Sequence, residues 1–119
     1  MNDRDYRTVL RMIARCEKID AILERFERSY ELFGTEVSFQ DSCCMNLIQI
    51  GELVGRLSDE LKERRSEVPW VKIRAARNLF AHDYDSVDAE SVWETVTRDV
   101  PALRGVLLEI LAENELDAG

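Results

Sequence analysis

Four residues in the stretch RNLFAHDY, at positions 77 to 84, have side chains that suit phosphate chemistry. Arg77 offers a planar guanidinium that stays charged and holds a phosphate through two parallel hydrogen bonds. His82, the single histidine of the chain, exchanges a proton near neutral pH. Asn78 precedes His82 by four residues and could orient its imidazole, and Tyr84 adds a hydroxyl two residues beyond. The stretch is therefore a candidate site for phosphodiester chemistry that needs no metal.

The spacing of Arg77 and His82 limits how one chain could use both. On an unbroken helix, a separation of five residues points the two side chains roughly 140° apart. A shared site therefore needs the helix to end near His82, or it needs a second chain. RNA cleavage without a metal usually needs one group that deprotonates the 2′-hydroxyl and another that protonates the leaving oxygen. Since each chain has one histidine, we expect a composite site across the twofold axis of a homodimer, and an inert monomer.

Simpler roles for the same residues stay open on the pattern alone. A histidine at a helix end is more often a cap or a hydrogen-bond partner than a catalyst. A lone tyrosine such as Tyr84 is more often packed than functional. The stretch by itself therefore allows a purely structural interpretation.

Charge is unevenly distributed along the chain. The net charge of −8 opposes nonspecific binding to nucleic acid, because such binding depends on local Lys and Arg. Residues 62–77 nevertheless carry six basic and two acidic side chains. Lys72 and Arg74 in this segment are candidate RNA-binding residues, and a solvated helix face is the alternative interpretation.

Apolar residues recur at three- and four-residue steps along nearly the whole chain, which predicts an all-α fold. One long amphipathic helix is expected over residues 4–28. A single turn is expected over 29–34, with Ser29 as its N-cap. A second long helix is expected to start at Ser38, and its apolar stripe reaches Leu61.

Two glycines, Gly51 and Gly55, lie one turn apart in the second expected helix. Each costs about 1 kcal/mol relative to alanine in a helix interior. The pair indicates either a backbone that another element approaches closely or simple tolerance of the cost.

The second half of the chain continues the helical pattern. Pro69 is well placed to open a third helix, and Asp88 to cap a fourth. Pro101 should kink or split the last segment near residues 97–100, because it removes one backbone hydrogen bond. Together the patterns predict an antiparallel bundle of about four to five helices that forms a single domain over residues 1–119.

The composition excludes several classes of protein. The three cysteines, Cys16, Cys43 and Cys44, lack C-x-x-C spacing, and with one histidine they make a zinc site improbable. They are expected to be thiols in a reducing compartment, packed as small apolar residues. No apolar run suggests a signal peptide or a membrane span, so a cytoplasmic protein is expected.

At the opening stretch the sequence resembles the HepT-like family, the toxin halves of HepT–MntA modules within the HEPN superfamily. The family signature is R-x4-6-H-x-Y, which Arg77, His82 and Tyr84 match here. Asn78 follows the arginine, as is common in that family. No departure from the signature is present.

The resemblance extends to the flanking segments. The stretch LIQIGELVGRLSDEL looks like the second helix of the family, with its I-G-E core at Ile50, Gly51 and Glu52. The stretch that begins VPWVKIRAARNLF looks like the motif helix and its continuation. The match covers nearly the whole chain, more loosely in the N-terminal helix.

The resemblance implies a HEPN helical bundle that dimerises, with the two motif segments facing each other across a cleft. It implies a ribonuclease that needs no metal or other cofactor, and whose RNA cleavage arrests growth. It also implies a partner, an MntA-like minimal nucleotidyltransferase, which neutralises the toxin by transferring AMP from ATP onto Tyr84. A modified Tyr84 would carry bulk and a permanent negative charge beside Arg77 and His82.

Three hypotheses follow. In the first, the chain is a dimeric endoribonuclease toxin in which His82 is the general acid or base, Arg77 holds the scissile phosphate and Asn78 supports the geometry. In the second, it is a non-catalytic module that binds a nucleotide, RNA or the nucleotidyltransferase. In the third, it is a structural helical dimer whose polar motif joins the interface.

Overall fold

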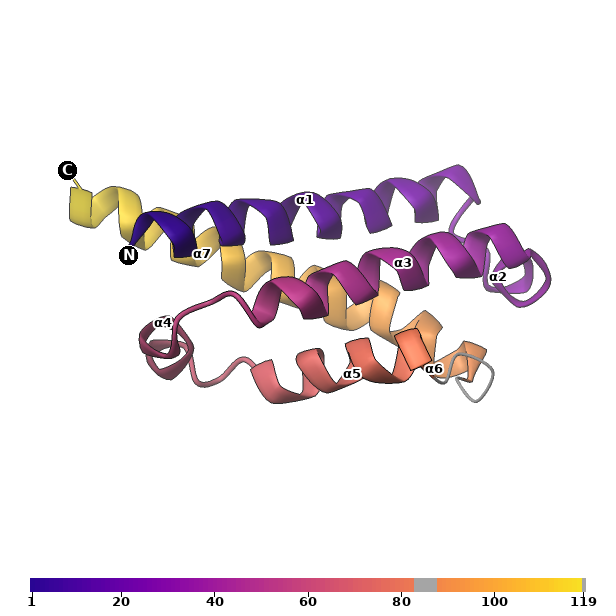
Figure 1. Cartoon of the computed structure of the whole chain (residues 1–119). Helices are drawn as coiled ribbons and strands as arrows, with labels where there is room; N and C mark the ends of the chain where they lie inside the picture. Colours follow the sequence, from indigo (N-terminus) through magenta and orange to yellow (C-terminus); the bar gives the residue numbers. More distant parts are fainter. Residues whose placement is uncertain (83–87, 119) are drawn as a thin grey trace.

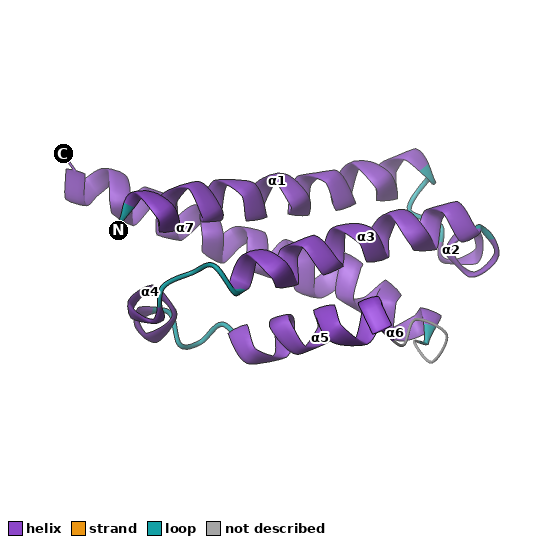
Figure 2. Cartoon of the chain, in the orientation of Figure 1, coloured by secondary structure: helices purple, strands orange, loops and turns teal. Residues whose placement is uncertain are grey.

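The computed structural model describes residues 1–82 and 88–118, and the elements within these ranges are helices. The predicted all-α helical bundle is confirmed (Figures 1 and 2). None of the described helices is both long and apolar enough to cross a membrane. The elements, in chain order, are α1 Asp3–Arg25, α2 Tyr30–Thr35, α3 Val37–Val54, α4 Asp59–Arg64, α5 Trp70–His82, α6 Ala89–Glu94, the π-helical segment η2 Thr95–Asp99, and α7 Val100–Ala118.

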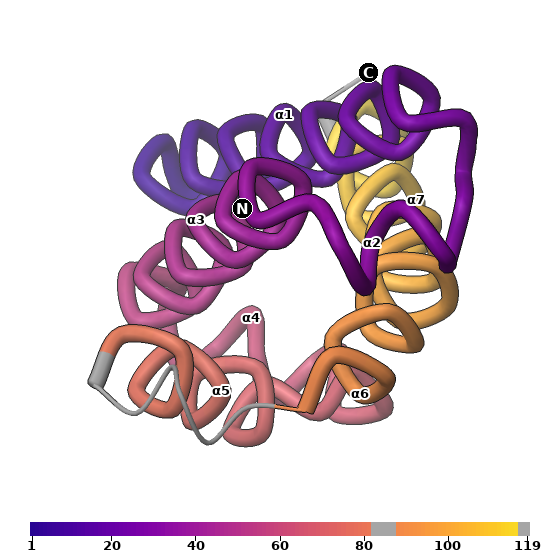
Figure 3. The backbone as a smooth tube through the Cα atoms, turned by 90° about the vertical axis from the view of Figure 1, so that its right-hand side faces the viewer, coloured from indigo at the N-terminus to yellow at the C-terminus, as the bar shows by residue number. Residues whose placement is uncertain are grey.

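Helix α3 is the centre of the bundle. It packs against α1 on one side and α5 on the other, and α1 also packs against α7 (Figure 1). Seen from the end of the bundle, α3 lies between α1 and α5, and α7 lies across from them (Figure 3). The apolar stripes of α1, α3 and α7 close into one core, whose fully buried side chains include Met12, Ile19, Phe39, Val54 and Leu107.

The three cysteines belong to this core. Cys16, Cys43 and Cys44 are all buried, as their apolar surroundings in the sequence predict. Burial disfavours the thiolate and raises the pKa of Cys16 to about 11 and that of Cys43 to about 12. These thiols are therefore packing groups, and their deprotonation opposes folding.

The first helix ends three residues earlier than expected. The amide of Glu27 donates to the carbonyl of Glu24 and that of Arg28 to the carbonyl of Leu23, a Schellman arrangement. Glu27 and Arg28 take left-handed backbone conformations, with φ of 60° and 51°. Glycine usually occupies the first of these positions, so a sequence with glutamate there gives no signal that the helix ends.

The second long helix also differs from its prediction at both ends. It begins at Val37, with Glu36 at its N-cap position, rather than at Ser38. It ends at Val54, and a separate short helix α4 follows, capped by the Ser58 hydroxyl. The buried carboxylate of Asp5 accepts hydrogen bonds from the Ser58 amide and hydroxyl at 2.9 and 2.6 Å. This contact with α1 stabilises the break, and residues far apart in sequence make it.

Other local signals are confirmed. The Ser29 hydroxyl accepts from the Leu32 amide and caps α2, and the Asp88 carboxylate caps α6. Helix α5 begins directly after Pro69. The π-helical segment η2 ends at Asp99, two residues before Pro101, and the amide of Val100 donates to the carbonyl of Thr95 instead of Val96. The missing amide and the ring of the proline account for this irregularity.

Candidate functional site

Helix α5, which carries the candidate site, packs on α3 at two glycines. A Cβ atom on Gly51 would collide with the Cβ of Arg77 and lie 3.2 Å from the Ile73 carbonyl oxygen. A Cβ atom on Gly55 would collide with the guanidinium of Arg74. Of the two interpretations of the glycine pair, the close approach of another backbone holds at Gly51, whereas Gly55 meets the end of a side chain. Gly55, however, lies just after the end of α3 rather than inside it, so only Gly51 carries the cost of an interior glycine.

Arg77 is held in place by two neighbours. Its Nε donates to Oε1 of Glu52 at 2.6 Å, and its Nη2 forms an ion pair with the same carboxylate. Its Nη1 donates to Oδ1 of Asn78 at 2.9 Å. A guanidinium has five N–H donors, so among the described residues one hydrogen on each terminal nitrogen stays available for a ligand. The side chain of Arg77 is 30% exposed, so a ligand can reach these hydrogens.

Asn78 contacts Arg77, because its carboxamide oxygen accepts a hydrogen bond from Nη1 of the guanidinium. The prediction that Asn78 orients His82 concerns a side chain outside the described residues, and it stays a prediction. Helix α5 is described as far as His82, but the side chain of His82 and all of Tyr84 lie outside the described residues. The convergence of His82 with Arg77, and the role of Tyr84, stay predictions.

The two candidate RNA-binding residues lie on opposite sides of α5. Two residues of separation place their side chains roughly 160° apart. Arg74 lies over Gly55 on the side of α3, one turn from Arg77. Lys72 lines a groove on the side of α7. Only Arg74 is therefore brought to the side of α5 that carries Arg77.

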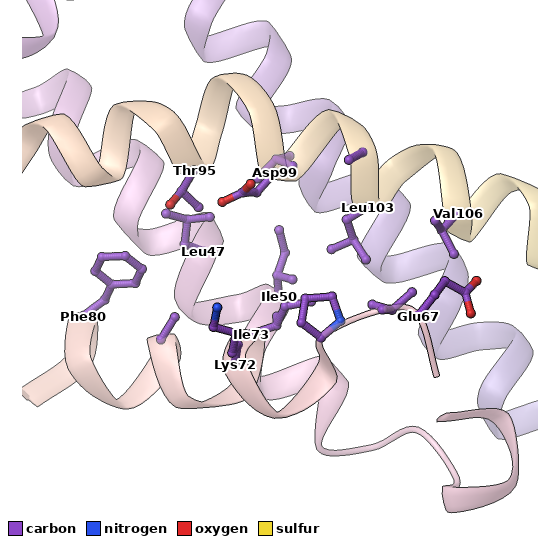
Figure 4. A pocket seen from close by; sticks show the side chains of 15 residues that line it. Leu47, Ile50, Glu67, Lys72, Ile73, Phe80, Thr95, Asp99, Leu103 and Val106 are labelled. Carbon is purple, nitrogen blue, oxygen red and sulfur yellow. The ribbon is translucent and has the colours of Figure 1, made fainter. Parts of the chain in front are cut away.

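The groove beside Lys72 is the second feature of α5. It has a volume of about 420 Å³ and lies between α5 and the η2–α7 segment. Figure 4 shows Phe80 at one end of the groove, near Thr95 and Leu47, and Leu103 and Val106 on α7 toward the other end. Its walls are mostly aliphatic and aromatic side chains, which suit apolar contacts rather than proton transfer.

Glu52 is the residue of this site to which the sequence patterns assign no chemistry. In the sequence Glu52 stands out only as the last residue of an I-G-E stretch, directly after Gly51, the glycine against which α5 packs. Because Gly51 brings Arg77 against the backbone of α3, the next residue of α3 is placed to meet the guanidinium. The signal that could have identified it is a carboxylate adjacent to a buried helix glycine.

The described residues contain no group of three or more His, Cys, Asp or Glu side chains that could hold a metal ion. The polar groups of the site are thus Arg77, Glu52 and Asn78, with Arg74 beside them. They provide a positioned cation with available hydrogen-bond donors. That arrangement can bind a phosphate and stabilise the charge that develops on it.

Known proteins similar to this chain carry ribonuclease names. A family model described as ribonuclease HepT-like matches residues 12–110. "Putative RNase TTE0752" from Caldanaerobacter subterraneus subsp. tengcongensis is 30% identical over 100 residues, which are 83% of this chain and 89% of that protein. "Probable ribonuclease HepT" from Thermococcus cleftensis is 31% identical over 84 residues, which are 63% of this chain and 76% of that protein.

A third relative is matched over less than half of its length. "Gamma-glutamylcyclotransferase and putative RNase MJ0434" from Methanocaldococcus jannaschii is 29% identical over 87 residues, which are 73% of this chain but 39% of that protein. No solved structure matches the chain.

Proposed function

The chain belongs to the HepT-like ribonuclease family, and we propose that it is the endoribonuclease toxin of a HepT–MntA-type module in the cytoplasm. The observation that carries the proposal is Arg77, which Glu52 and Asn78 hold while two of its hydrogen-bond donors have no partner among the described residues. It lies five residues before His82, the last residue of α5. In the proposed reaction each protomer supplies one held cation and one histidine, which lie five residues apart in the sequence.

In the proposed reaction two protomers supply one site. His82 of one protomer takes the proton of the RNA 2′-hydroxyl, and the 2′-oxygen attacks the adjacent phosphorus. The bond from phosphorus to the 5′-oxygen breaks, and His82 of the other protomer protonates that oxygen. Arg77 binds the phosphate and stabilises the charge that grows on its oxygens. The products are a 2′,3′-cyclic phosphate and a 5′-hydroxyl, and the step uses no metal.

Glu52 acts in this proposal as a positioning residue. A mobile arginine side chain loses considerable freedom when it is fixed, and Glu52 and Asn78 fix Arg77 before the substrate arrives. Glu52→Ala should therefore lower kcat roughly ten- to hundredfold. Glu52→Gln keeps an oxygen that accepts from Nε, so it should recover part of the loss. A matched control is Glu24→Ala, which removes a similar ion pair with Arg28 far from the site.

The proposed regulator is an MntA-like minimal nucleotidyltransferase. In that step the Tyr84 hydroxyl oxygen attacks the α-phosphorus of ATP, pyrophosphate leaves, and AMP stays on the tyrosine. The support is the resemblance to the family together with the position of Tyr84, two residues beyond His82. Mass spectrometry of the protein after incubation with the nucleotidyltransferase and Mg-ATP should find AMP on the peptide that contains Tyr84. Tyr84→Phe should remove the modification.

The central experiment is an RNA cleavage assay with EDTA present. Purified protein should cut total RNA under these conditions, and His82→Ala should not. Light scattering should report a mass near twice 13.8 kDa, since a composite site needs a homodimer. Equal cleavage by both proteins, or none by either, would contradict the catalytic assignment.

A second candidate function is a non-catalytic binding module. The observation that favours it is the pairing of Arg77 with Glu52 inside one protomer, which gives the arginine a purely structural use. In that case Tyr84 would be modified although the unmodified protein cuts no RNA. The two functions are separated by running both assays on the same preparation.

A further inference from the structure

Helix α1 carries a stripe of positive charge outside the site described above. Its cations recur at three- and four-residue steps, so they fall within roughly 80° of the helix circumference. The members of this α1 stripe are Arg4, Arg7, Arg11, Arg15 and Lys18. Four of the five side chains are exposed, and Arg15 is half-buried. The stripe extends over about 21 Å of the helix.

The orientation of α1 is given by two contacts. Nη1 of Arg15, in the stripe, donates to Oδ1 of Asn46 on α3 at 3.3 Å. A second side of α1, the acidic side, carries Glu17, Asp20 and Glu24. Glu17 forms an ion pair with Arg104 of α7 at 3.8 Å. The α1 stripe therefore borders α3, and the acidic side borders α7.

The register of α1 against α3 brings the stripe level with the candidate site. Arg15 meets Asn46 and Asp5 meets Ser58, so the two helices run antiparallel, and residues 7–11 lie alongside the α3 turn that contains Gly51. The same turn of α3 receives Arg77 from the other side. Figures 1 and 3 show α3 between α1 and α5. Since packed helices are 8–10 Å apart, the stripe and Arg77 are separated by roughly 16–20 Å across the exposed side of α3.

This face carries more cations than carboxylates in a chain of net charge −8. It combines the α1 stripe with Arg74 and Arg77 on α5, while the exposed side of α3 adds Asp41 and Glu52, the latter paired with Arg77. Seven of the 16 Lys and Arg residues of the chain therefore lie here. Among the described residues none of the α1 cations has a carboxylate within ion-pair distance, whereas Arg28, Arg65 and Arg104 elsewhere are each paired. Unneutralised arginines in a row are an electrostatic feature that attracts anions.

We propose that the α1 stripe binds the phosphate backbone of the RNA strand whose scissile phosphate lies at Arg77. The inference rests on the proposed ribonuclease function. A single strand that crosses the exposed side of α3 would meet Arg77 and Arg74 first and the stripe a few nucleotides later. The confinement of these cations to one face also accounts for RNA binding by an acidic protein.

RNA fits the stripe better than an acidic protein surface does. A row of cations at regular axial steps matches a linear polyanion, and phosphate contacts stay hydrated. Burying the same arginines against a protein would need a carboxylate for each one, because an unpaired buried charge is costly. A second copy could offer Glu17, Asp20 and Glu24, so self-association is the competing outcome of the test.

The test compares two double variants of equal charge. Arg7→Gln with Arg11→Gln removes two cations of the stripe, and Arg98→Gln with Arg104→Gln removes two from the η2–α7 segment. The probe is a fluorescent 2′-O-methyl RNA 20-mer, which lacks the nucleophilic hydroxyl and cannot be cut. Fluorescence anisotropy gives Kd over a range of salt concentrations.

The stripe variant should raise Kd roughly tenfold and reduce the slope of log K against log salt by about 1.4, since each phosphate contact on a single strand contributes about 0.7. The η2–α7 variant should leave both values near those of the native protein. In the cleavage assay the stripe variant should raise KM and leave kcat unchanged, because the contact is the same in ground and transition states. Thermal unfolding confirms that both variants are folded.

The failure of the inference is separable from that of the proposed function. Unchanged Kd and KM in the stripe variant, with cleavage intact, would overturn the inference alone. Loss of dimers in the stripe variant, with unchanged Kd for RNA, would assign the stripe to a second copy instead. Stripe-dependent binding of the 20-mer by a protein that cuts no RNA would support the stripe and contradict the catalytic function.

Discussion

The two sides of α5 are built differently. On the side of α3, α5 is in close contact with its neighbour, because Gly51 has no side chain to hold the backbone of α5 away and Glu52 pairs with Arg77. Toward α7 the same helix is separated from its neighbour by an apolar groove of about 420 Å³. The position of Arg77 is therefore determined by α3 and is largely independent of α7. Changes on the α3 side should alter chemistry, and changes on the α7 side should alter stability alone.

The largest expected effect is on the α3 side, at the guanidinium. Arg77→Ala should lower kcat for RNA cleavage by roughly 10²- to 10⁴-fold, because it removes the group that stabilises the developing phosphate charge. Arg77→Lys should recover only a small part, since an ammonium cannot make the same fork of hydrogen bonds with Glu52 and a phosphate. Steady-state kinetics on an RNA oligonucleotide measure both. Full activity in the lysine variant would show that the geometry held by Glu52 does not matter.

The next largest effect is on stability, at the contact between Gly51 of α3 and the backbone of α5. Gly51→Ala should cost about 2–3 kcal/mol of unfolding free energy, because its methyl group meets the Cβ of Arg77 and the backbone of α5, which cannot move aside cheaply. Cleavage should fall with it, since α5 must shift.

Gly55→Ala is the matched control for Gly51→Ala. Its methyl group collides with the flexible end of Arg74, which can move aside, and lies 3.3 Å from the Glu52 carbonyl oxygen, so the change in unfolding free energy should stay within about 1 kcal/mol. Urea unfolding of the two variants measures the difference. Equal losses would mean that α3 does not control the position of α5 in the way described.

On the α7 side, Leu103→Ala should cost about 2 kcal/mol, at the low end for a leucine, because one side of Leu103 already borders the groove. The kcat of this variant should be unchanged. Leu107→Ala, on the same helix but fully buried, should cost more. A large fall in kcat for Leu103→Ala would remove the proposed independence of the two sides.

The smallest expected effect is a pH dependence of the unfolding free energy that comes from the buried thiols of the core. The folded-state pKa values of Cys16 and Cys43, about 11 and 12, exceed the ordinary value of 9.0, so the unfolded chain loses thiol protons first as pH rises. The unfolding free energy should therefore fall by about 1 kcal/mol per thiol between pH 8 and 10. Urea unfolding at the two pH values should detect it, and Cys16→Ala should reduce the difference. An identical pH dependence in that variant would contradict burial as its cause.

Much of the fold was accessible from local patterns. Helical periodicity, the caps at Ser29 and Asp88 and the irregularity before Pro101 depend on residues within one or two turns of each other, so they are visible in sequence. The end of α1 was not, because Glu27 occupies a position that usually requires glycine. The break before α4 was not, because it is stabilised by Asp5, which lies 53 residues from Ser58.

For the candidate site, the sequence by itself determined which residue types are present: one histidine, an arginine five residues before it, and a tyrosine two residues after it. It also determined that the side chains of Arg77 and Lys72 point roughly 140° apart on one helix, because a helix turns 100° per residue. Only the tertiary structure decided that Glu52 holds Arg77 and that the α1 stripe lies level with it. The physical reason is that both depend on how α3 packs between α1 and α5. That packing is controlled by contacts between residues far apart in the chain, which no local pattern encodes.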